Sequence, residues 1–315
     1  MLKREFENTV NSIISNGNLE CGLVAYVLMK QGNRLELKKL LLDTDLTRSI
    51  KGKLKGVIDE QYLADEVKFD DISNIIDNKK NIYVLEQNNE YCPFEFLSDI
   101  NQVNASFQEN NYDNIMGFIF KINLNDNSLY IYQQAYSGTK LKNNNVLHIV
   151  NKGSDCYGVF NKNLLRIDKR AEIIIVENKL YIKKFEVLQD KFGFQVYARK
   201  EADKVITQIR SLDIVTNIDK IVQRSMQPKL TTAKKLMKIK NSPVLRMEKE
   251  DLVDKLNTIP RYKSMVTIEN GKIKTNSIGD VNNFLKILND DILISELTKQ
   301  EYDSQAKKKI EALVE

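Results

Sequence analysis

Apolar and polar residues alternate along the chain with two periodicities, one typical of strands and one typical of helices. Apolar runs bounded by Gly, Asn and Asp predict strands, whereas apolar residues that recur every three or four positions predict helices. Asp43 and Thr44 are suited to begin the first of these helices. The predicted elements of the first third are, in order, strands at 19–29 and 34–42, helices at 43–63 and 70–76, a strand at 81–87 and a helix at 93–107.

The pattern changes after the asparagine-rich segment 109–114, where we place a domain boundary. Two strand–turn–strand patterns, at 117–136 and 171–185, predict β-hairpins, and Asn270-Gly271 predicts a third at 266–275. Further helices are predicted at 200–224, 280–290 and 299–313. The chain is therefore expected to be α+β, with mixed and antiparallel sheets, several β-hairpins and packed helices. Its expected division is an N-terminal α/β region at 1–112 and an α+β domain at 113–315.

Composition narrows the class of protein. Of the 315 residues, 42% are hydrophobic and 29% are charged, which is typical of a soluble globular protein. The longest apolar runs are far shorter than the ~20 residues that span a bilayer. The first ten residues, MLKREFENTV, lead into no apolar segment of the kind found in a signal peptide. We therefore expect a cytoplasmic protein that reaches the membrane only through a partner.

Several kinds of chemistry lack the residues they need. Cys21, Cys92 and Cys156 are odd in number and form no CxxC pair, which argues against a disulfide scaffold or a zinc ribbon. His148 is the only histidine, so sites built on paired histidines are unavailable. A Cys156–His148 pair has no supporting motif, and a strand around His148 explains the residues equally well. Phosphate-binding glycine loops and a GxSxG motif are also missing from the sequence.

One pattern fits a metal-dependent nuclease. Asp168, followed by Glu177 and Lys179 behind an apolar run, has the order D…ExK, in which two carboxylates hold Mg²⁺ and the lysine assists the attack of water. That chemistry needs Glu177 and Lys179 on one face of a continuous strand. Asn178 between them suggests a hairpin turn instead. The sequence leaves the nuclease as the alternative and predicts no metal site otherwise.

The strongest signal is a run of positive charge at 220–246. This stretch, KIVQRSMQPKLTTAKKLMKIKNSPVLR, holds eight cationic residues and no carboxylate. Thr231 and Thr232 are suited to cap a helix over AKKLMKIK, with its apolar residues inward and its lysines outward. We expect the cations to bind phosphates, although a solvated helix with favourable charges at its end is the alternative. The residues assigned to this surface are Lys229, Lys234, Lys235, Lys238, Lys240 and Arg246, with Lys249, Arg261, Tyr262 and Lys263 as an extension.

The order of elements from about residue 115 onward resembles a known family. It runs from GFIFKINLNDNSLYIYQQAY through AEIIIVENKLYIKKFEVLQDKFGF and KKLMKIKNSPVL to ENGKIKTNSIGDVNNFLKILNDDIL. These segments look like the DUF4868 family, and in particular like its KwaB-type members from the Kiwa anti-phage defence system. The resemblance rests on hairpins and helices and carries no catalytic motif.

The resemblance implies a function that fits the run of positive charge. It implies a cytosolic DNA-binding subunit. Because lysines contact phosphates without reading bases, we expect it to bind double-stranded DNA without sequence preference, and we expect no cofactor and a homo-oligomer. It also implies association with a membrane-spanning KwaA-type partner and action on phage DNA. Two alternatives remain: a Mg²⁺-dependent nuclease using Asp168, Glu177 and Lys179, and a scaffold whose basic surface docks an acidic protein or an anionic lipid.

Overall fold

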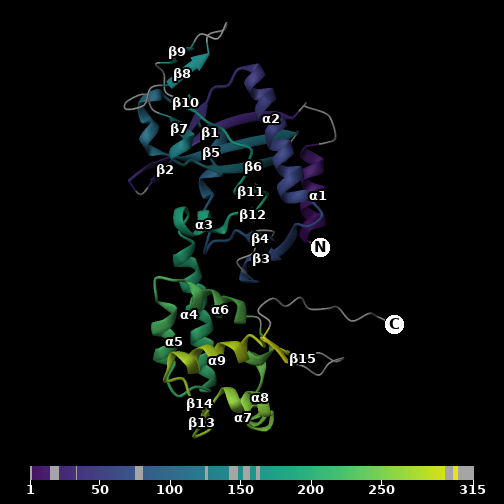
Figure 1. Cartoon of the computed structure of the whole chain (residues 1–315), viewed down its shortest axis with the longest axis vertical. Helices are drawn as coiled ribbons and strands as arrows, with labels where there is room; N and C mark the ends of the chain where they lie inside the picture. Colours follow the sequence, from purple (N-terminus) through teal and green to yellow (C-terminus); the bar gives the residue numbers. More distant parts are fainter. Residues whose placement is uncertain are drawn as a thin grey trace, which may run out of the picture. The chain divides into compact units, whose positions relative to one another are not determined.

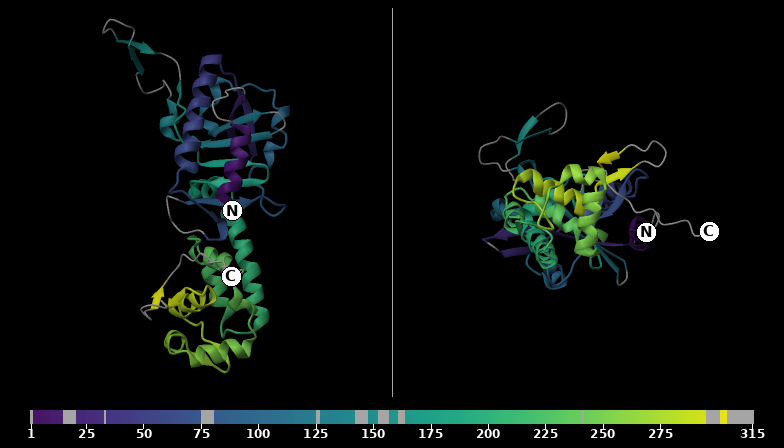
Figure 2. Two further views of the ribbon diagram at one scale, coloured as in Figure 1. Left: turned by 90° about the vertical axis from the view of Figure 1, so that its right-hand side faces the viewer. Right: turned by 90° about the horizontal axis from the view of Figure 1, so that it is seen from below.

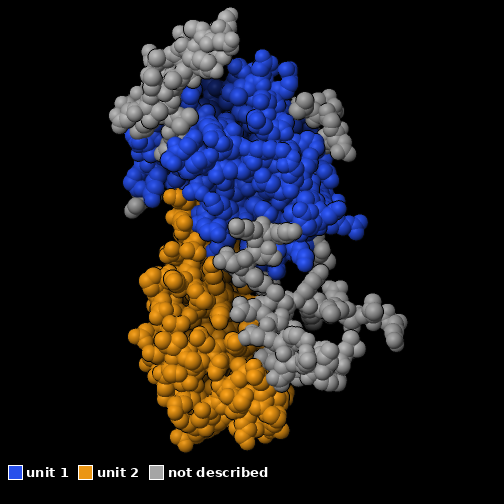
Figure 3. All heavy atoms as spheres, in the orientation of Figure 1, with its two compact units in different colours: residues 1–71, 78–188 blue, residues 72–77, 189–315 orange. Residues whose placement is uncertain are grey.

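The computed structural model divides the chain into two compact units. It describes residues 2–14, 21–32, 34–74, 81–124, 127–141, 148–151, 157–160, 164–240, 242–294 and 301–303. Unit 1 contains residues 1–71 and 78–188, and unit 2 contains residues 72–77 and 189–315 (Figure 3). We describe each unit by itself.

Unit 1 is built on a mixed sheet of eight strands. Their order across the sheet is β2-β1-β5-β6-β11-β12-β4-β3, with every neighbouring pair antiparallel except β3 and β4 (Figure 1). The strands are β1 (Gly22–Gln31), β2 (Arg34–Leu40), β3 (Lys68–Asp71), β4 (Asn81–Glu86), β5 (Ile115–Leu124), β6 (Asn127–Gln134), β11 (Ile173–Val176) and β12 (Lys179–Ile182). The fold class predicted from the sequence, α+β with packed helices, is confirmed.

Two helices, α1 (Leu2–Ile13) and α2 (Thr44–Ile58), cover one face of this sheet (Figures 1 and 2). Their buried side chains join one cluster with alternate residues of the central strands, because successive strand residues point to opposite faces. Tyr62, in the π-helical turn Asp59–Leu63 that continues α2, is fully buried in this cluster. On the other face the segment 91–102 packs, with the Phe94 ring against Tyr132 and the Tyr26 hydroxyl donating to the Ile100 carbonyl.

Short-range signals in unit 1 are realised as expected in several places. Asp43 accepts a hydrogen bond from the backbone N–H of Leu46 and so caps α2. β5 and β6 pair as predicted, from Gly117 with Gln134 to Leu124 with Asn127, and the hairpin of β11 and β12 turns at Glu177, whose φ of 52° lies in the left-handed region. Two small two-stranded sheets stand beside the main sheet: β7 (Lys140–Leu141) with β10 (Leu164–Leu165), and β8 (His148–Asn151) with β9 (Tyr157–Phe160).

Unit 2 is mainly helical. The long helix α4 packs against α5 and α6, and α6 and α8 pack against α9. The predicted Asn270-Gly271 hairpin forms, with both residues at positive φ, as a type I′ turn requires. The elements are α4 (Phe194–Leu212), α5 (Ile218–Ser225), α6 (Thr231–Ile239), α7 (Lys249–Thr258), α8 (Pro260–Met265), β13 (Ile268–Glu269), β14 (Lys272–Ile273), α9 (Ile278–Leu288), β15 (Ile292–Ile294) and β16 (Glu301–Asp303). The division between the units falls within α3 (Phe185–Lys191).

Two predicted helices do not form: one at 93–107 in unit 1 and one at 70–76, where the chain passes from unit 1 to unit 2. Segment 93–107 contains only the 3₁₀ turns Glu95–Leu97 and Ile100–Gln102, after which the backbone of 105–107 bonds to Lys39 on the outer edge of β2. Side chains of Ser, Asp and Asn in this segment compete with the backbone for helical hydrogen bonds. Segment 70–76 is the end of β3 and the 3₁₀ turn Ile72–Asn74, and its last two residues lie outside the described residues.

Two more predictions are corrected in unit 2. The helix predicted at 200–224 is two helices, because Asp213 adopts a left-handed conformation (φ 50°) that ends α4. Within the segment predicted as a helix at 299–313, residues 301–303 form β16 instead, and residues 299–300 and 304–313 lie outside the described residues.

The two compact units differ from the division at residues 112 and 113. β1 and β5 lie on either side of that point in the sequence and are hydrogen-bonded neighbours in one sheet. The asparagine-rich segment before β5 is a 3₁₀ turn, Glu109–Asn114, within unit 1. Backbone pairing over long sequence separations, which local composition does not reveal, is what joins the two parts.

Candidate nucleic-acid interface

The run of positive charge at 220–246 lies in unit 2, on α5, α6 and the 3₁₀ turn Pro243–Arg246. α6 buries Ala233, Leu236, Met237 and Ile239, the four apolar residues predicted to face inward. The predicted threonine cap is wrong: Leu230 is the N-cap residue, it makes no side-chain capping bond, and Thr232 is buried inside the helix. The helix is therefore fixed by its apolar face and not by a side-chain cap.

The lysines of α6 lie on its less buried side. Lys234, Lys235 and Lys238 are half-buried, and their spacing of one and three residues keeps them near one another on the helix surface. Lys229 before the helix and Arg246 after it are exposed. Lys229, Lys235 and Arg246 make no ion pair or hydrogen bond with any residue that the structure describes. These three side chains can therefore meet an external anion without first giving up a bond to a described residue.

Lys240 has a different environment. Its Nζ lies 2.8 Å from Glu201 Oε2, and the Nζ of Lys204 lies 2.7 Å from Glu201 Oε1. The Glu201 side chain on α4 is only 5% exposed. Burial would raise the pKa of Glu201, but the hydrogen bonds from Lys204 and Lys240 outweigh burial and hold the pKa below its ordinary value. Lys240 is thus tied to α4, and its charge is partly neutralised.

The residues predicted to extend this surface differ in how far their charge is offset by neighbours. Lys249 on α7 lies 3.5 Å from Asp213, which also binds Lys272 at 2.6 Å, so its charge is partly offset. Arg261, Tyr262 and Lys263 lie together on α8. None of the three is buried.

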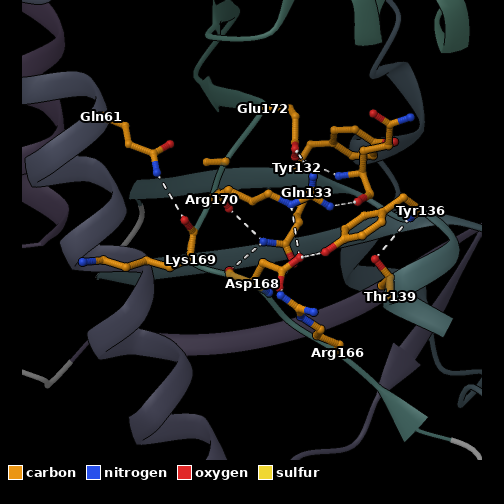
Figure 4. A network of polar contacts seen from close by, with 12 residues as sticks. Gln61, Tyr132, Gln133, Tyr136, Thr139, Arg166, Asp168, Lys169, Arg170 and Glu172 are labelled. Carbon is orange, nitrogen blue, oxygen red and sulfur yellow. Dashed lines mark hydrogen bonds and ion pairs between the residues drawn. The ribbon is translucent and has the colours of Figure 1, made fainter. Parts of the chain in front are cut away.

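Asp168, the first residue of the nuclease alternative, is the centre of a polar network in unit 1 (Figure 4). Its carboxylate accepts hydrogen bonds from the Tyr136 hydroxyl at 2.6 Å and from Arg166 Nε at 2.5 Å, and Arg170 Nε lies 3.5 Å away. The Gln133 side chain bonds the backbone of Asp168 and Arg170. Burial would raise the pKa of Asp168, but these partners outweigh it and lower the pKa.

The segment around Asp168 carries side chains of alternating charge. Arg166, Asp168, Arg170 and Glu172 occupy every second position, and Arg170 Nη1 lies 3.0 Å from Glu172. The buried Glu172 carboxylate also accepts the backbone N–H of Gln134, and burial raises its pKa. This alternation is visible in the sequence as RIDKRAE, and it is the signal by which the network could have been predicted. Each carboxylate of this series is bound to neighbouring protein groups, as is typical of a structural ion-pair series.

Glu177 and Lys179 lie apart from Asp168. Asp168 precedes β11, whereas Glu177 follows it, so the two carboxylates lie at opposite ends of the strand. Glu177 occupies the left-handed turn position, and the Lys179 ammonium forms an ion pair with Glu5 of α1. The Glu5 bond raises the pKa of Lys179. This geometry does not assemble the D…ExK centre, and the nuclease alternative gains no support from it.

The remaining candidates offer no metal centre among the residues described. No group of three or more His, Cys, Asp or Glu is arranged there to hold a metal ion. Cys21 is buried and Cys92 is exposed, both as free thiols. His148 lies in β8, opposite Phe160 of β9, and Cys156 lies outside the described residues. In the described part of the chain, no helix is both long enough and apolar enough to span a bilayer.

Comparison with known proteins agrees with the resemblance seen in the sequence. A family model described as "Kiwa protein KwaB-like" matches residues 112–298, which is more than half of the chain. The "Kiwa protein KwaB" of Escherichia coli O55:H7 (strain RM12579 / EPEC) is 23% identical over 207 residues. That match covers 64% of this chain and 65% of the relative, slightly under two thirds of its length. No solved structure matches the chain. These matches concern KwaB and do not bear on the DUF4868 label. The family model shows that the chain belongs to the Kiwa protein KwaB-like family.

Proposed function

We propose that this chain is a component of a Kiwa anti-phage system that binds DNA without sequence preference. Membership of the KwaB-like family supports the role in a Kiwa system. DNA binding is supported by one observation: α6 buries its apolar side and leaves a lysine-bearing side, flanked by the exposed Lys229 and Arg246, in a stretch without any carboxylate. Contacts from lysines to phosphates do not read base sequence, which suits binding to the DNA of different phages.

The contacts of the cationic side chains rank the residues that we propose to bind phosphate. Lys229, Lys235 and Arg246 are the strongest candidates, because they make no bond to a described residue. Lys234 and Lys238 belong to the same side of α6 and are retained. Lys240 contributes less, because its ammonium already binds Glu201.

The partners and location follow from the same proposal. The chain would act as a homo-oligomer and meet a membrane-spanning KwaA-type subunit at the inner face of the cell membrane. It would occupy phage DNA without cutting it and without a cofactor. Mg²⁺ would be needed only for the nuclease alternative, which a plasmid cleavage assay with Mg²⁺ and with EDTA tests directly.

The test of DNA binding is a titration of random-sequence duplex followed by fluorescence anisotropy. We expect binding that is equal for unrelated sequences and that weakens steeply between about 50 mM and 200 mM salt. Binding to anionic vesicles but not to duplex DNA would instead support a scaffold that docks on lipid. Absence of duplex binding at about 50 mM salt would overturn the proposal.

A further inference from the structure

Two arginines from different helices of unit 2 converge on one residue. Arg199 lies in the second turn of α4, and Arg224 lies in the last turn of α5. Gln227, in the turn that leads to α6, accepts a hydrogen bond from each of them. Arg199 Nη2 donates to the Gln227 carbonyl oxygen at 3.3 Å, and Arg224 Nη1 donates to its Oε1 at 3.1 Å.

Neither guanidinium is neutralised by a described carboxylate. Among the described residues, no Asp or Glu lies within ion-pair distance of Arg199 or Arg224. Asp203 is four residues from Arg199 on the same helix, but its side chain makes no bond to a described residue, and its backbone carbonyl accepts the Thr207 hydroxyl. Two guanidinium groups that bond to the same residue without a carboxylate partner concentrate positive charge around Gln227, so an anion bound there would be stabilised.

Packing holds the two side chains in place. Both arginines are half-buried, and the Nε atom of each is buried without a hydrogen-bond partner in the described structure. The solvent-accessible atoms of each side chain therefore do not include Nε. One terminal nitrogen of each guanidinium bonds to Gln227, which leaves Arg199 Nη1 and Arg224 Nη2 as donors. A guanidinium held in this way loses less conformational entropy when it binds a ligand.

The chemistry of the pair suits a phosphate. Guanidinium groups present paired N–H donors whose spacing matches the oxygens of a phosphate, and two of them can share one group. Arg224 belongs to the run of positive charge at 220–246, and the exposed Lys229 of that run follows Gln227 by two residues.

We infer that Arg199 and Arg224 form a clamp for a single phosphodiester of the nucleic-acid backbone, oriented by Gln227. This inference rests on the proposed DNA binding and deepens it. The lysines of α6 supply point charges, whereas the arginine pair supplies forked donors that set where the nucleic-acid backbone lies. In this account Gln227 is a positioning residue, because it acts through the two arginines.

The test compares salt dependence among matched variants. One phosphate adds about 0.9 to the slope of log affinity against log salt. Arg199→Gln and Arg224→Gln should each lower the slope by up to about 0.9, and the double variant should lower it by no more than that, because both contact one phosphate. Affinity of the double variant should fall by about tenfold at about 100 mM salt. Arg210→Gln with Lys255→Gln removes the same charge from exposed positions of α4 and α7 and should leave the slope unchanged.

Two further variants distinguish the contribution of the guanidinium geometry from that of the charge alone. Arg199→Lys with Arg224→Lys keeps the charge and should keep the slope while affinity falls severalfold, because the forked donors are lost. Gln227→Ala keeps both arginines and should weaken binding without changing the slope. If the wild-type protein binds DNA and the double Arg→Gln variant binds with the same affinity and slope, the clamp is wrong and the proposed function stands. If the wild-type protein binds no DNA, the proposed function itself falls, and the clamp with it.

Discussion

Replacing Glu201 by Gln tests whether Lys240 is a structural residue. The Glu201 carboxylate is 5% exposed and lies 2.8 Å from Lys240 Nζ and 2.7 Å from Lys204 Nζ. Gln keeps the size of the side chain and removes its charge. We therefore expect the fold to persist and α6 to be held less firmly against α4.

The expected loss can be worked from these contacts. Removing one partner of a fully buried ion pair costs about 3–5 kcal/mol. Here the side chains of Lys204 and Lys240 are 43% and 51% exposed, so they regain water when the carboxylate is lost. The side-chain oxygen of Gln can still accept one hydrogen bond, and the neutral Gln side chain no longer carries the free-energy cost of burying the carboxylate charge. About 1–2 kcal/mol of unfolding free energy should remain as the loss, close to one charge-assisted hydrogen bond.

The assay is urea unfolding of the full chain followed by circular dichroism. The matched control is Asp203→Asn, which removes one negative charge from an exposed position on the same helix and should change stability by less than about 0.5 kcal/mol. The midpoint for Glu201→Gln should fall at constant slope. Equal midpoints for the two variants would refute the reasoning that Glu201 anchors α6.

The same pair predicts a pH dependence. Because the pKa of Glu201 in the folded protein lies below its ordinary value of 4.5, its contribution is complete above that value and is lost as the pH falls through the folded pKa. The stability gap between the wild-type protein and Glu201→Gln should therefore be full at neutral pH and shrink on acidification below about 4.5. A gap that widens on acidification would contradict the lowered pKa.

Three other substitutions have defined outcomes. Gly117→Ala should destabilise unit 1 by about 1–3 kcal/mol in a thermal melt, because the new Cβ would lie 2.5 Å from the Gln133 carbonyl oxygen; an unchanged melting temperature would contradict this packing. Tyr136→Phe removes the 2.6 Å bond to Asp168 and should lower the melting temperature in the same assay by less than Gly117→Ala does; no loss would mean that the bond does not contribute. Glu177→Ala should leave protection against phage intact, and loss of protection in a folded, normally expressed variant would revive the nuclease.

Local signals in the sequence predicted those elements that depend on few neighbours. The Asp43 cap, the Asn270-Gly271 turn and the inward face of α6 are set by side chains within a turn or two, and all three are found. The helix predicted at 93–107 does not form; its last residues, 105–107, bond instead to Lys39, more than sixty residues earlier in the chain. Local helix propensity is a weak guide where such tertiary contacts compete.

The roles of individual charged residues likewise could not be predicted from local sequence. The cations at 220–246 could be recognised from composition, but their individual roles could not. Lys240 binds Glu201, which lies 39 residues earlier and is brought to it by the packing of α4 on α6, whereas Lys229 makes no bond to a described residue. The convergence of Arg199 and Arg224 on Gln227 likewise depends on two helices that meet in space. The sheet order, in which β1 pairs with β5 and β4 pairs with β12, leaves no trace in local composition.

The most direct test of DNA binding through the basic stretch is the salt slope of the wild-type protein and one triple variant. With about four to six phosphates neutralised, log affinity for random duplex should fall against log salt with a slope of about −4 to −5. Changing Lys234, Lys235 and Lys238 together to Ala should flatten that slope by up to about 3, roughly one unit for each lost contact. A triple variant that stays folded and binds duplex DNA with the wild-type slope would contradict the account.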